Sequence, residues 1–367
     1  MVATLAPAGS PPLAELLLVH TGQHYDQALS RLFFDQLGIP PPDHNLEVGS
    51  GAHGAQTGLI LERFEPVVVD WKPDAVIVVG DVNSTLACAL AAAKLHVPVA
   101  HVEAGLRSFD RTMPEEINRV LTDDLAEWLF ASEPAGAVNL RFEGHAQEKI
   151  HLVGNVMIDS LQRFLPAARK SPALEQFGLL AASGSGEGGR ARPFVLLTLH
   201  RPSNVDDPAR LRALAEALRE IGGQAPVLFP AHPRTAERLE RFDLLSRFSD
   251  HWDTQGRGLR LVAPLGYLEF LHLLSEAECV LTDSGGIQEE TTALGVPCLT
   301  LRDSTERPIT VEEGTNTLVG SDPSQIVAEA RRALDGGGKR GRVPPLWDGR
   351  AASRIAVILL RDLAARR

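Results

Sequence analysis

The sequence predicts an α/β protein made of two Rossmann-like domains that face each other across a cleft. Short apolar runs alternate with helical segments, and several runs are apolar throughout, which is typical of parallel strands buried on both faces. The alternation stops in a Gly- and Ser-rich stretch near the middle of the chain and then restarts. Open sheets of this kind bind ligands beyond the carboxyl ends of their strands, so we expect a site between the two domains.

In the N-terminal half, the first expected strand is Leu16–Thr21, which follows a Pro/Ala-rich lead-in. A doubly wound domain normally begins with a strand, so one more strand is expected ahead of Leu16. The lead-in shows no such apolar run, so we interpret the first strand of this domain as missing from the sequence. The remaining expected strands are 75–79, 97–102, 129–131 and 150–153. The expected helices run through 29–37 and 56–71, and begin at Asn83-Ser84-Thr85 and at Pro114.

In the C-terminal half, the expected strands are 194–198, 227–230, 259–262, 279–281 and 296–301. The expected helices include 207–222 and a final amphipathic helix at 351–364. The predicted organisation is an N-terminal domain at 1–170, a linker or insertion at 171–192, a C-terminal domain at 193–350, and a helix at 351–367 that packs back on the N-terminal domain.

Composition excludes several classes of protein. The chain has 367 residues, of which 44% are hydrophobic, and a net charge of −11, which disfavours a non-specific nucleic-acid binder. Its three cysteines lie far apart in apolar runs, which predicts buried free thiols in a reducing compartment and no metal site. Without a long apolar span or a signal-peptide start, we expect a cytoplasmic protein with no membrane partner.

The stretch from Leu281 to Pro308 carries the clearest ligand signal. The stretch begins with an apolar run and a turn at Ser284-Gly285-Gly286. A helix follows the turn, and a second apolar run follows the helix. Glycines allow close backbone approach, and the free N–H groups of a helix N-terminus favour a phosphate. Glu290 falls about one turn into that helix, where a carboxylate accepts hydrogen bonds from sugar hydroxyls, and Arg307 follows the next strand. The pattern predicts a site for a pyrophosphate and a ribose.

Four polar residues follow predicted strands or open a helix beside one: Asp81, Glu103, Glu115 and His200. Such positions suit acids and bases that move a proton. Each also has a structural alternative. Asp81 is equally explained as a helix cap, and Glu115, like Glu116, as a first-turn acid favoured by the helix dipole. A rim histidine explains His232 as well as a ligand contact does.

Taken together, the motifs resemble the non-hydrolysing UDP-N-acetylglucosamine 2-epimerases. The matching segments are HTGQHYD (20–26), GDVNSTLA (80–87), HVEAGLRSFDRTMPEEINR (101–119), HLVGNVMID (151–159), LTLHRPSN (197–204), LTDSGGIQEE (281–290) and LRDSTERP (301–308). The resemblance implies a glycosyltransferase-B-like arrangement, no cofactor and a homodimer. It implies interconversion of UDP-GlcNAc and UDP-ManNAc through 2-acetamidoglucal and UDP, which supplies cell-surface polysaccharide precursors.

Residue by residue, the resemblance makes Asp81, Glu103 and Glu115 catalytic carboxylates and His200 the cleft histidine. The implied substrate contacts are Ser284, Gly285, Gly286, Glu290, Arg307 and Phe270. A second UDP-GlcNAc, bound as an activator in some members, is implied at Gln23, His24, Arg201 and His232. Two positions depart from the family pattern: Leu265 replaces a glutamine near the uracil, and Asp26 replaces a glutamine of the activator region.

The start of the chain also departs from the family. Members open with a strand and a GTRPE-type loop that helps to hold the diphosphate, whereas this sequence begins about where that loop ends. We therefore expect weakened folding of the first domain and little or no epimerase activity. A chain extended upstream with equal turnover would contradict this expectation.

Three other functions remain open from the sequence. A glycosyltransferase of the same architecture shares the glycine turn and the ribose-binding glutamate but has no need for the three acids together. A hydrolysing epimerase releases free ManNAc. A nucleotide-sugar-binding protein binds without turnover.

Overall fold

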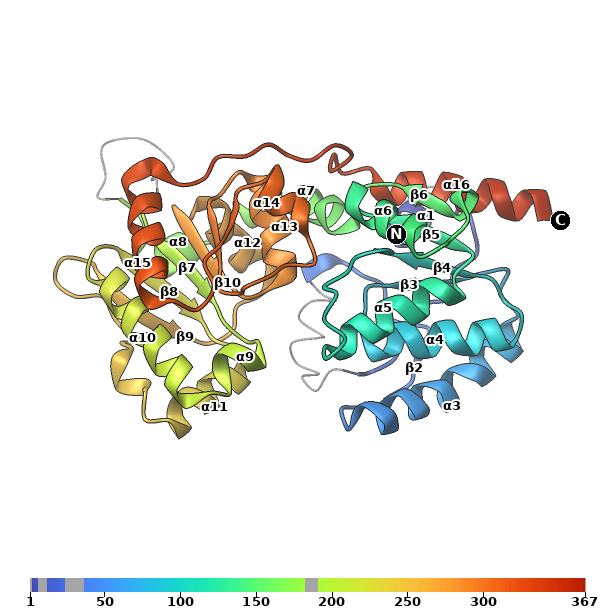
Figure 1. Cartoon of the computed structure of the whole chain (residues 1–367), viewed down its shortest axis with the longest axis horizontal. Coiled ribbons are helices and arrows are strands. Elements are labelled where there is room, and N and C mark those ends of the chain that lie inside the picture. The colour runs from blue at the N-terminus through green and yellow to red at the C-terminus, as the bar shows by residue number, and fades with distance from the viewer. Residues whose placement is uncertain (1, 6–11, 24–35, 182–190, 367) are drawn as a thin grey trace. The chain divides into compact units, whose positions relative to one another are not determined.

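The computed structural model describes residues 2–5, 12–23, 36–181 and 191–366 (Figure 1). Their contacts divide the chain into two compact units: unit 1 comprises Met1–Ser160 and Pro345–Arg367, and unit 2 comprises Leu161–Pro344. The division falls inside helix α7 (Val156–Ala168). Most of the helix predicted at 29–37 lies outside the described residues.

Unit 1 is built on a four-stranded parallel sheet whose strands follow sequence order. They are β3 (Val76–Val79), β4 (Val99–Val102), β5 (Trp128–Ala131) and β6 (Ile150–Leu152). Helices α4 (Asn83–Lys94), α5 (Pro114–Leu125) and α6 (Pro134–Phe142) connect them, and α3 (His53–Trp71) packs beside α4. Strands β4 and β5 are fully buried because helices cover both faces of this sheet.

Alternation along β5 shows how the two faces are filled. Leu129 belongs to the core that contains α3 and α4, whereas Trp128 and Phe130 belong to the opposite core. The C-terminal helix α16 (Ala351–Arg366) supplies Ile355 and Leu359 to that second core (Figure 1). Trp128 donates its indole N–H to Asp362 at 2.9 Å. Unit 1 is therefore built from the first part of the sequence together with its last helix.

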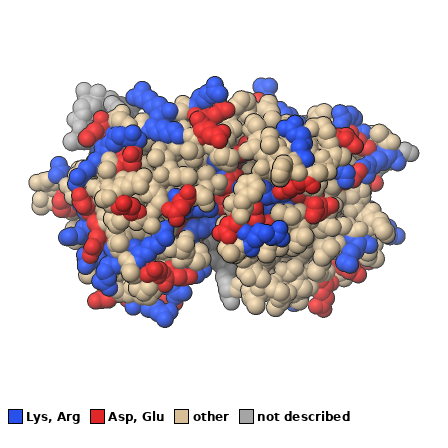
Figure 2. All heavy atoms as spheres, viewed as in Figure 1, with Lys and Arg blue, Asp and Glu red and all other residues tan. Residues whose placement is uncertain are grey.

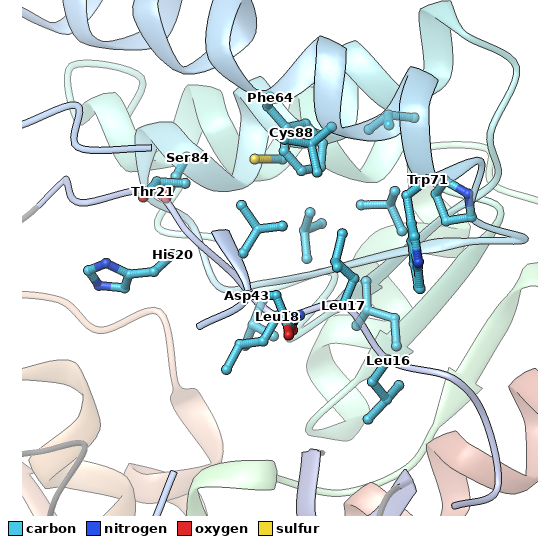
Figure 3. A pocket seen from close by; sticks show the side chains of 18 of the residues that line it. Leu16, Leu17, Leu18, His20, Thr21, Asp43, Phe64, Trp71, Ser84 and Cys88 are labelled. Carbon is cyan, nitrogen blue, oxygen red and sulfur yellow. Dashed lines mark hydrogen bonds between the residues drawn. The ribbon is translucent and has the colours of Figure 1, made fainter. Parts of the chain in front are cut away.

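A separate parallel pair, β1 (Val19–His20) and β2 (His44–Asn45), belongs to the same unit. A mostly apolar cavity of about 700 Å³ is lined by residues of β1, β3, α3 and α4 (Figure 3). Leu16 and Leu17 line the cavity and form no ladder with a neighbouring strand, so β1 is shorter than the predicted 16–21 run. In the described part of the chain, the only element ahead of β1 is the short helix α1 (Val2–Leu5).

Unit 2 contains a six-stranded parallel sheet in the order β12-β11-β10-β7-β8-β9. Its strands are β7 (Val195–Thr198), β8 (Pro226–Pro230), β9 (Gly258–Val262), β10 (Cys279–Thr282), β11 (Cys298–Thr300) and β12 (Asn316–Leu318). The first strand of the unit, β7, lies between the second and the fourth, so the order reverses between β7 and β10. Ligands bind at such a switch point in doubly wound sheets.

The helices of unit 2 begin and end where proline, aspartate and glycine mark the sequence. Those that follow its strands are α9 (Pro202–Val205), α10 (Pro208–Gly222), α11 (Pro233–Arg241), α12 (Tyr267–Glu276), α13 (Gly285–Leu294), α14 (Pro308–Glu312) and α15 (Pro323–Arg332). Asp207 caps α10 by accepting a hydrogen bond from the backbone N–H of Ala209. Gly295 ends α13 in the left-handed conformation, with φ +74°.

Part of the stretch expected to link the domains is structured. Helix α8 (Ala173–Gln176) and the residues after it place Leu174, Phe177 and Leu179 in a buried core of unit 2. Residues 182–190 lie outside the described part of the chain. The contact boundary at Ser160 lies ten residues before the predicted limit at 170, and the one at Pro345 lies five residues before the predicted limit at 350.

The surface carries both signs of charge. On the face shown in Figure 2, basic and acidic side chains are interspersed. Of the helices in the described ranges, none has the length and apolar character to cross a bilayer.

Candidate functional site

In unit 1, the predicted acids Asp81 and Glu103 follow two neighbouring strands. Strands β3 and β4 pair in parallel up to Val79 and Val102, so the turns after them leave the same edge of the sheet. The structure thereby brings together two turns that are far apart in the sequence. Gly80 begins the first turn with φ +73°.

The turn that carries Glu103 has a strained backbone. Glu103 has φ +74°, a left-handed conformation that a non-glycine residue adopts at a cost of about 1–3 kcal/mol. The N–H groups of Glu103 and Ala104 both donate to the carbonyl of Phe130 at 3.1 Å. Gly105 ends the turn against the backbone of Gly136, where an added Cβ would lie 2.3 Å from a carbonyl oxygen. Position 105 therefore requires glycine. The hydrogen bonds of the turn hold the backbone of Glu103 in place, and Glu103 itself is half-buried.

Asp81 is bound by an arginine that the sequence analysis did not single out. Arg119 donates from Nε and Nη2 to Asp81 Oδ2 at 2.9 and 2.7 Å, and from Nη1 to Glu116 Oε2 at 2.6 Å. The Arg119 side chain is buried, whereas that of Asp81 is 28% exposed. Both bonds end on one oxygen of Asp81. The alternative that Asp81 caps helix α4 is wrong, because the N-cap is Val82 and makes no side-chain bond.

The expected cap at Asn83-Ser84-Thr85 is also wrong, because Asn83 is already inside the helix. Its side chain instead donates to Gln56 at 2.8 Å in a buried polar cluster. Asn118 extends this cluster by donating to the carbonyl of Asp81 at 2.9 Å. Asn118 of α5, which also lies 3.4 Å from Asn83 Oδ1, therefore links the Asp81 turn to this cluster.

The adjacent glutamates of α5 have different environments. Glu116 is buried and accepts from the N–H groups of Ser108 and Phe109 at 2.9 and 2.8 Å. Burial opposes its ionisation, but these bonds and Arg119 outweigh it and lower the pKa of Glu116. Glu115, the predicted catalytic acid, lies one residue earlier in the first turn and is half-buried. Glu116 orders the loop before the helix, which leaves Glu115 as the more accessible acid.

In unit 2, the predicted residues lie at the switch point. Thr198 ends β7 opposite Thr282 of β10, and their hydroxyl oxygens are 2.6 Å apart. His200 follows β7, and Ser284 follows β10 as the N-cap of α13. The Ser284 side chain makes no capping bond, and the helix begins at Gly285. Backbone N–H groups at such a terminus favour an anion by about 0.3–2 kcal/mol.

Asp283 fixes the loop that carries His200. It is fully buried and accepts from the backbone N–H groups of His200 and Arg201 at 3.1 and 3.0 Å and from Asn204 Nδ2 at 3.0 Å. The His200 Nδ1 atom lies 3.1 Å from the same carboxylate, and the ring is 43% exposed. Burial opposes ionisation of Asp283, but its bonds to His200 and Asn204 outweigh burial and lower its pKa. A carboxylate at Nδ1 orients the ring with Nε2 free to meet a ligand.

Arg307 lies against the glycine turn. An added Cβ on Gly285 would lie 2.4 Å from Arg307 Nη1, so any larger residue would have to displace this guanidinium. Arg307 pairs with Glu289 at 3.0 Å and approaches Glu306 at 3.5 Å. Burial opposes ionisation of Glu306, but Arg302 and Arg307 hold its pKa at about 2. The acids keep the guanidinium at the start of α13, where a diphosphate is expected.

Glu290 differs from these paired acids. It is 5% exposed, and the hydroxyl of Tyr267 donates to it at 3.4 Å. Burial raises the pKa of Glu290 to about 7, and the nearby charge of Glu289 adds to the shift, against the bond from Tyr267. A ligand hydroxyl that donated to Glu290 would favour its ionised form.

The other predicted contacts lie around these two sites. Phe270, within α12, and Leu265, just before that helix, pack at the edge of a core of unit 2. Of the activator residues, Gln23 accepts from the Ser84 N–H at 2.9 Å in unit 1. His232 caps α11 in unit 2 and accepts from the Arg234 N–H at 3.3 Å. His24 lies outside the described residues.

Sequence reasoning missed several residues that shape the site: Arg119, Asn118, Asp123, Asp283 and Glu289. All of them lie within or beside the quoted motifs, so their position was available. Their roles were not, because an internal ion pair leaves no spacing rule in the sequence. In the described residues, no group of three His, Cys, Asp or Glu side chains is placed to hold a metal ion.

The chain has extensive similarity to known proteins. A family model described as UDP-N-acetylglucosamine 2-epimerase matches residues 10–360. The UDP-N-acetylglucosamine 2-epimerase of Methanocaldococcus jannaschii is 44% identical over 93% of this chain and 90% of that protein. The UDP-2,3-diacetamido-2,3-dideoxy-D-glucuronate 2-epimerase of Pseudomonas aeruginosa is 45% identical over 94% and 91%.

Solved structures confirm the predicted fold class. The crystal structure of Methanocaldococcus jannaschii UDP-GlcNAc 2-epimerase in complex with UDP-GlcNAc and UDP matches with a TM-score of 0.85 at 41% identity, covering 98% of this chain and 96% of that one. The Neisseria meningitidis enzyme bound to UDP-GlcNAc matches with a TM-score of 0.78 at 30% identity, covering 91% and 90%. With its glycine turn at the switch point of unit 2 and its acids at the strand ends of unit 1, the chain belongs to the UDP-N-acetylglucosamine 2-epimerase family of isomerases.

Proposed function

We propose that this chain interconverts UDP-GlcNAc and UDP-ManNAc by inverting C2, and that it supplies precursors of cell-surface polysaccharide. The observation that carries the proposal is the constraint on the acids of unit 1. Asp81 and Glu103 leave neighbouring strands on held turns, with Glu115 on the helix that supplies Arg119. A glycosyltransferase with the same nucleotide turn has no need for these acids.

The proposed reaction balances protons and charge. One acid of unit 1 takes the C2 proton while the C1–O bond breaks, and UDP leaves anti with the bonding electrons to give 2-acetamidoglucal. UDP then adds back to C1 as a proton returns to the opposite face of C2. Asp81, Glu103 and Glu115 share these transfers, and a positioned acid or base contributes about 10²–10⁴ in rate. His200 donates to the departing diphosphate.

The nucleotide is held by unit 2 in this proposal. The N–H groups at Ser284, Gly285 and Gly286 bind the diphosphate, with Arg307 beside them. Glu290 accepts from the ribose hydroxyls, and Phe270 lies beside the uracil. At Leu265, where the family has a glutamine, backbone atoms replace the missing side-chain contact.

Deuterium exchange tests the reaction directly. The full chain is incubated with UDP-GlcNAc alone in heavy water, and label at C2 is followed by NMR over long incubations, so that slow turnover also registers. We expect slow labelling at C2 and slow formation of UDP-ManNAc, and loss of both in Asp81→Asn. Asp70→Asn, an exposed position at the end of α3, is the control. Binding without exchange would support a binding protein, and free ManNAc a hydrolysing enzyme.

A second substrate is favoured by one relative. The protein named for UDP-2,3-diacetamido-2,3-dideoxy-D-glucuronate is as similar to this chain as the UDP-GlcNAc enzymes are. We therefore propose a parallel exchange assay with both nucleotide sugars. Label appearing only in the diacetamido sugar would retain the C2 chemistry and replace UDP-GlcNAc as the substrate.

Activation and assembly follow from the same proposal. A second UDP-GlcNAc binds at Gln23, His24, Arg201 and His232, so conversion of pure UDP-ManNAc shows a lag that traces of UDP-GlcNAc remove.

A homodimer forms through unit 1, which exposes Leu121 on α5 and Phe142 on α6. Light scattering at the mass of one chain would contradict the dimer. The buried thiols favour the cytoplasm as its compartment.

A further inference from the structure

We propose that His101 is a positioning residue, a buried imidazolium that holds the turns of Asp81 and Glu103 in a fixed relation. His101 lies on β4, two residues before Glu103, and is completely buried. The proposal rests on the proposed function, because it matters for the reaction only if these acids move the C2 proton.

The partners of the ring require two protons on it. His101 Nδ1 lies 2.6 Å from Asp123 Oδ1, and Nε2 lies 2.9 Å from the carbonyl oxygen of Gly80. The Gly80 carbonyl can only accept a hydrogen bond. Asp123 also accepts from Arg107 and from the Gly105 N–H, so its side chain is an ionised carboxylate. A neutral imidazole has one N–H and leaves either the buried Asp123 oxygen or the half-buried Gly80 carbonyl without this donor. The imidazolium donates to both.

These bonds connect the two acid turns. Gly80 immediately precedes Asp81, and its carbonyl receives one N–H of the ring. Asp123 receives the other, and its second oxygen accepts from the N–H of Gly105 at 3.1 Å, which closes the strained turn of Glu103. One side chain, with its aspartate, therefore ties both turns to the same strand.

The charges around the ring stabilise its ionised form. Asp123 faces it from α5 and Glu103 from the turn that follows β4, and the Gly80 turn carries Asp81, which Arg119 neutralises. Beyond Asp123, Arg107 pairs with that aspartate at 2.7 Å and with Glu143 at 2.6 Å. Burial opposes protonation of His101, but Asp123, the Gly80 carbonyl and Glu103 outweigh it and raise the pKa.

The sign of the pH dependence follows. The imidazolium and both of its bonds persist below the ordinary histidine pKa of 6.5 and above it, until the pH rises through the raised value. Loss of the proton then releases either the Gly80 carbonyl or Asp123. Turnover should fall on the alkaline side as the acid turns loosen.

The test compares His101→Gln with His151→Gln, which changes a histidine on β6 of the same sheet. Burial lowers the pKa of His151, so above pH 6.5 that ring is neutral while His101 stays charged up to its raised pKa. We expect His101→Gln to lower kcat for C2 exchange by about 10- to 100-fold with KM changed less than about threefold, because the nucleotide is held elsewhere. The control should change neither. His101→Gln should also remove the alkaline loss that is due to this group.

Two readouts do not depend on activity. In the full chain labelled with ¹⁵N-histidine, one ring should show two protonated nitrogens above pH 6.5, and His101→Gln should remove that resonance. Amide hydrogen exchange at Gly105 should accelerate in His101→Gln and not in His151→Gln. A neutral His101 in the wild-type protein, or unchanged kcat in a folded His101→Gln, overturns the proposal. Absence of C2 exchange in the wild-type protein would instead count against the proposed function.

Discussion

At the scale of single residues, the acid site depends on side chains that neutralise and orient its carboxylates. Arg119 touches both Asp81 and Glu116 and is itself buried. Because both of its bonds to Asp81 end on one oxygen, the other oxygen of Asp81 stays available for a proton. Asp283 has a comparable role for His200 in unit 2.

Arg119→Lys should keep the charge that neutralises Asp81 but lose the geometry that orients it. A lysine ammonium is a point charge and cannot make the forked contact to Asp81 while also reaching Glu116. We expect C2 exchange to fall by about 10- to 100-fold, as for other small misplacements of catalytic groups. Arg141→Lys, at an exposed position of α6, serves as the control. Equal exchange rates in both variants would show that Asp81 does not depend on Arg119.

Glu290 should make stability depend on pH. The unfolded chain releases this proton near 4.5, whereas the folded protein retains it up to about 7. Its contribution to stability is therefore complete below pH 4.5 and is lost as the pH rises through about 7, a difference of about 3 kcal/mol. Glu290→Gln should flatten the free energy of unfolding over this range, as measured by urea titration. Glu240→Gln, on an exposed face of α11, should leave the slope unchanged.

At the scale of elements, helix α13 acts through its first turn. Its N-terminus follows β10 at the point where strand order reverses, and Gly285 allows Arg307 to lie against the backbone. The sequence identified this turn because glycine and an apolar run are local signals. It missed β12, which begins with Asn316 and Thr317 and has no apolar run. That strand forms because β11 offers it a parallel edge.

Gly285→Ala should weaken binding of UDP. The new methyl group overlaps the Arg307 guanidinium and moves it away from the helix start. Loss of one charge-assisted contact corresponds to about a tenfold or greater loss of affinity by calorimetry. Gly58→Ala, where the space around an exposed helical glycine is open, should instead raise the free energy of unfolding by about 0.5–1 kcal/mol. Unchanged UDP affinity in Gly285→Ala would place the diphosphate elsewhere.

At the scale of the whole molecule, the two ends of the sequence belong to one unit. Helix α16 buries Ile355 and Leu359 against the sheet of unit 1, after the chain has formed all of unit 2. Folding of unit 1 therefore depends on residues near the C-terminus, although its strands come from the first part of the chain.

Leu359→Ala should destabilise the protein by about 2–5 kcal/mol, because it removes buried methyl groups and leaves a cavity. Val357→Ala, on the same helix at 68% exposure, should cost little. Hydrogen exchange will locate the effect, with faster exchange expected in β4 and β5 and unchanged exchange in β7 and β10. Equal destabilisation of the two sheets would contradict the assignment of α16 to unit 1.

The sequence by itself determined the α/β class, nearly all the strands, the glycine turn and the family, because strand periodicity, helix punctuation and motif spacing are local. It could not show that Arg119 binds Asp81, that His101 joins two turns, or that burial leaves Glu290 protonated near neutral pH. Those features depend on distances between residues far apart in the chain and on the exclusion of water around them. Only the tertiary structure decides both, because ion pairing and desolvation arise when the strands and helices pack.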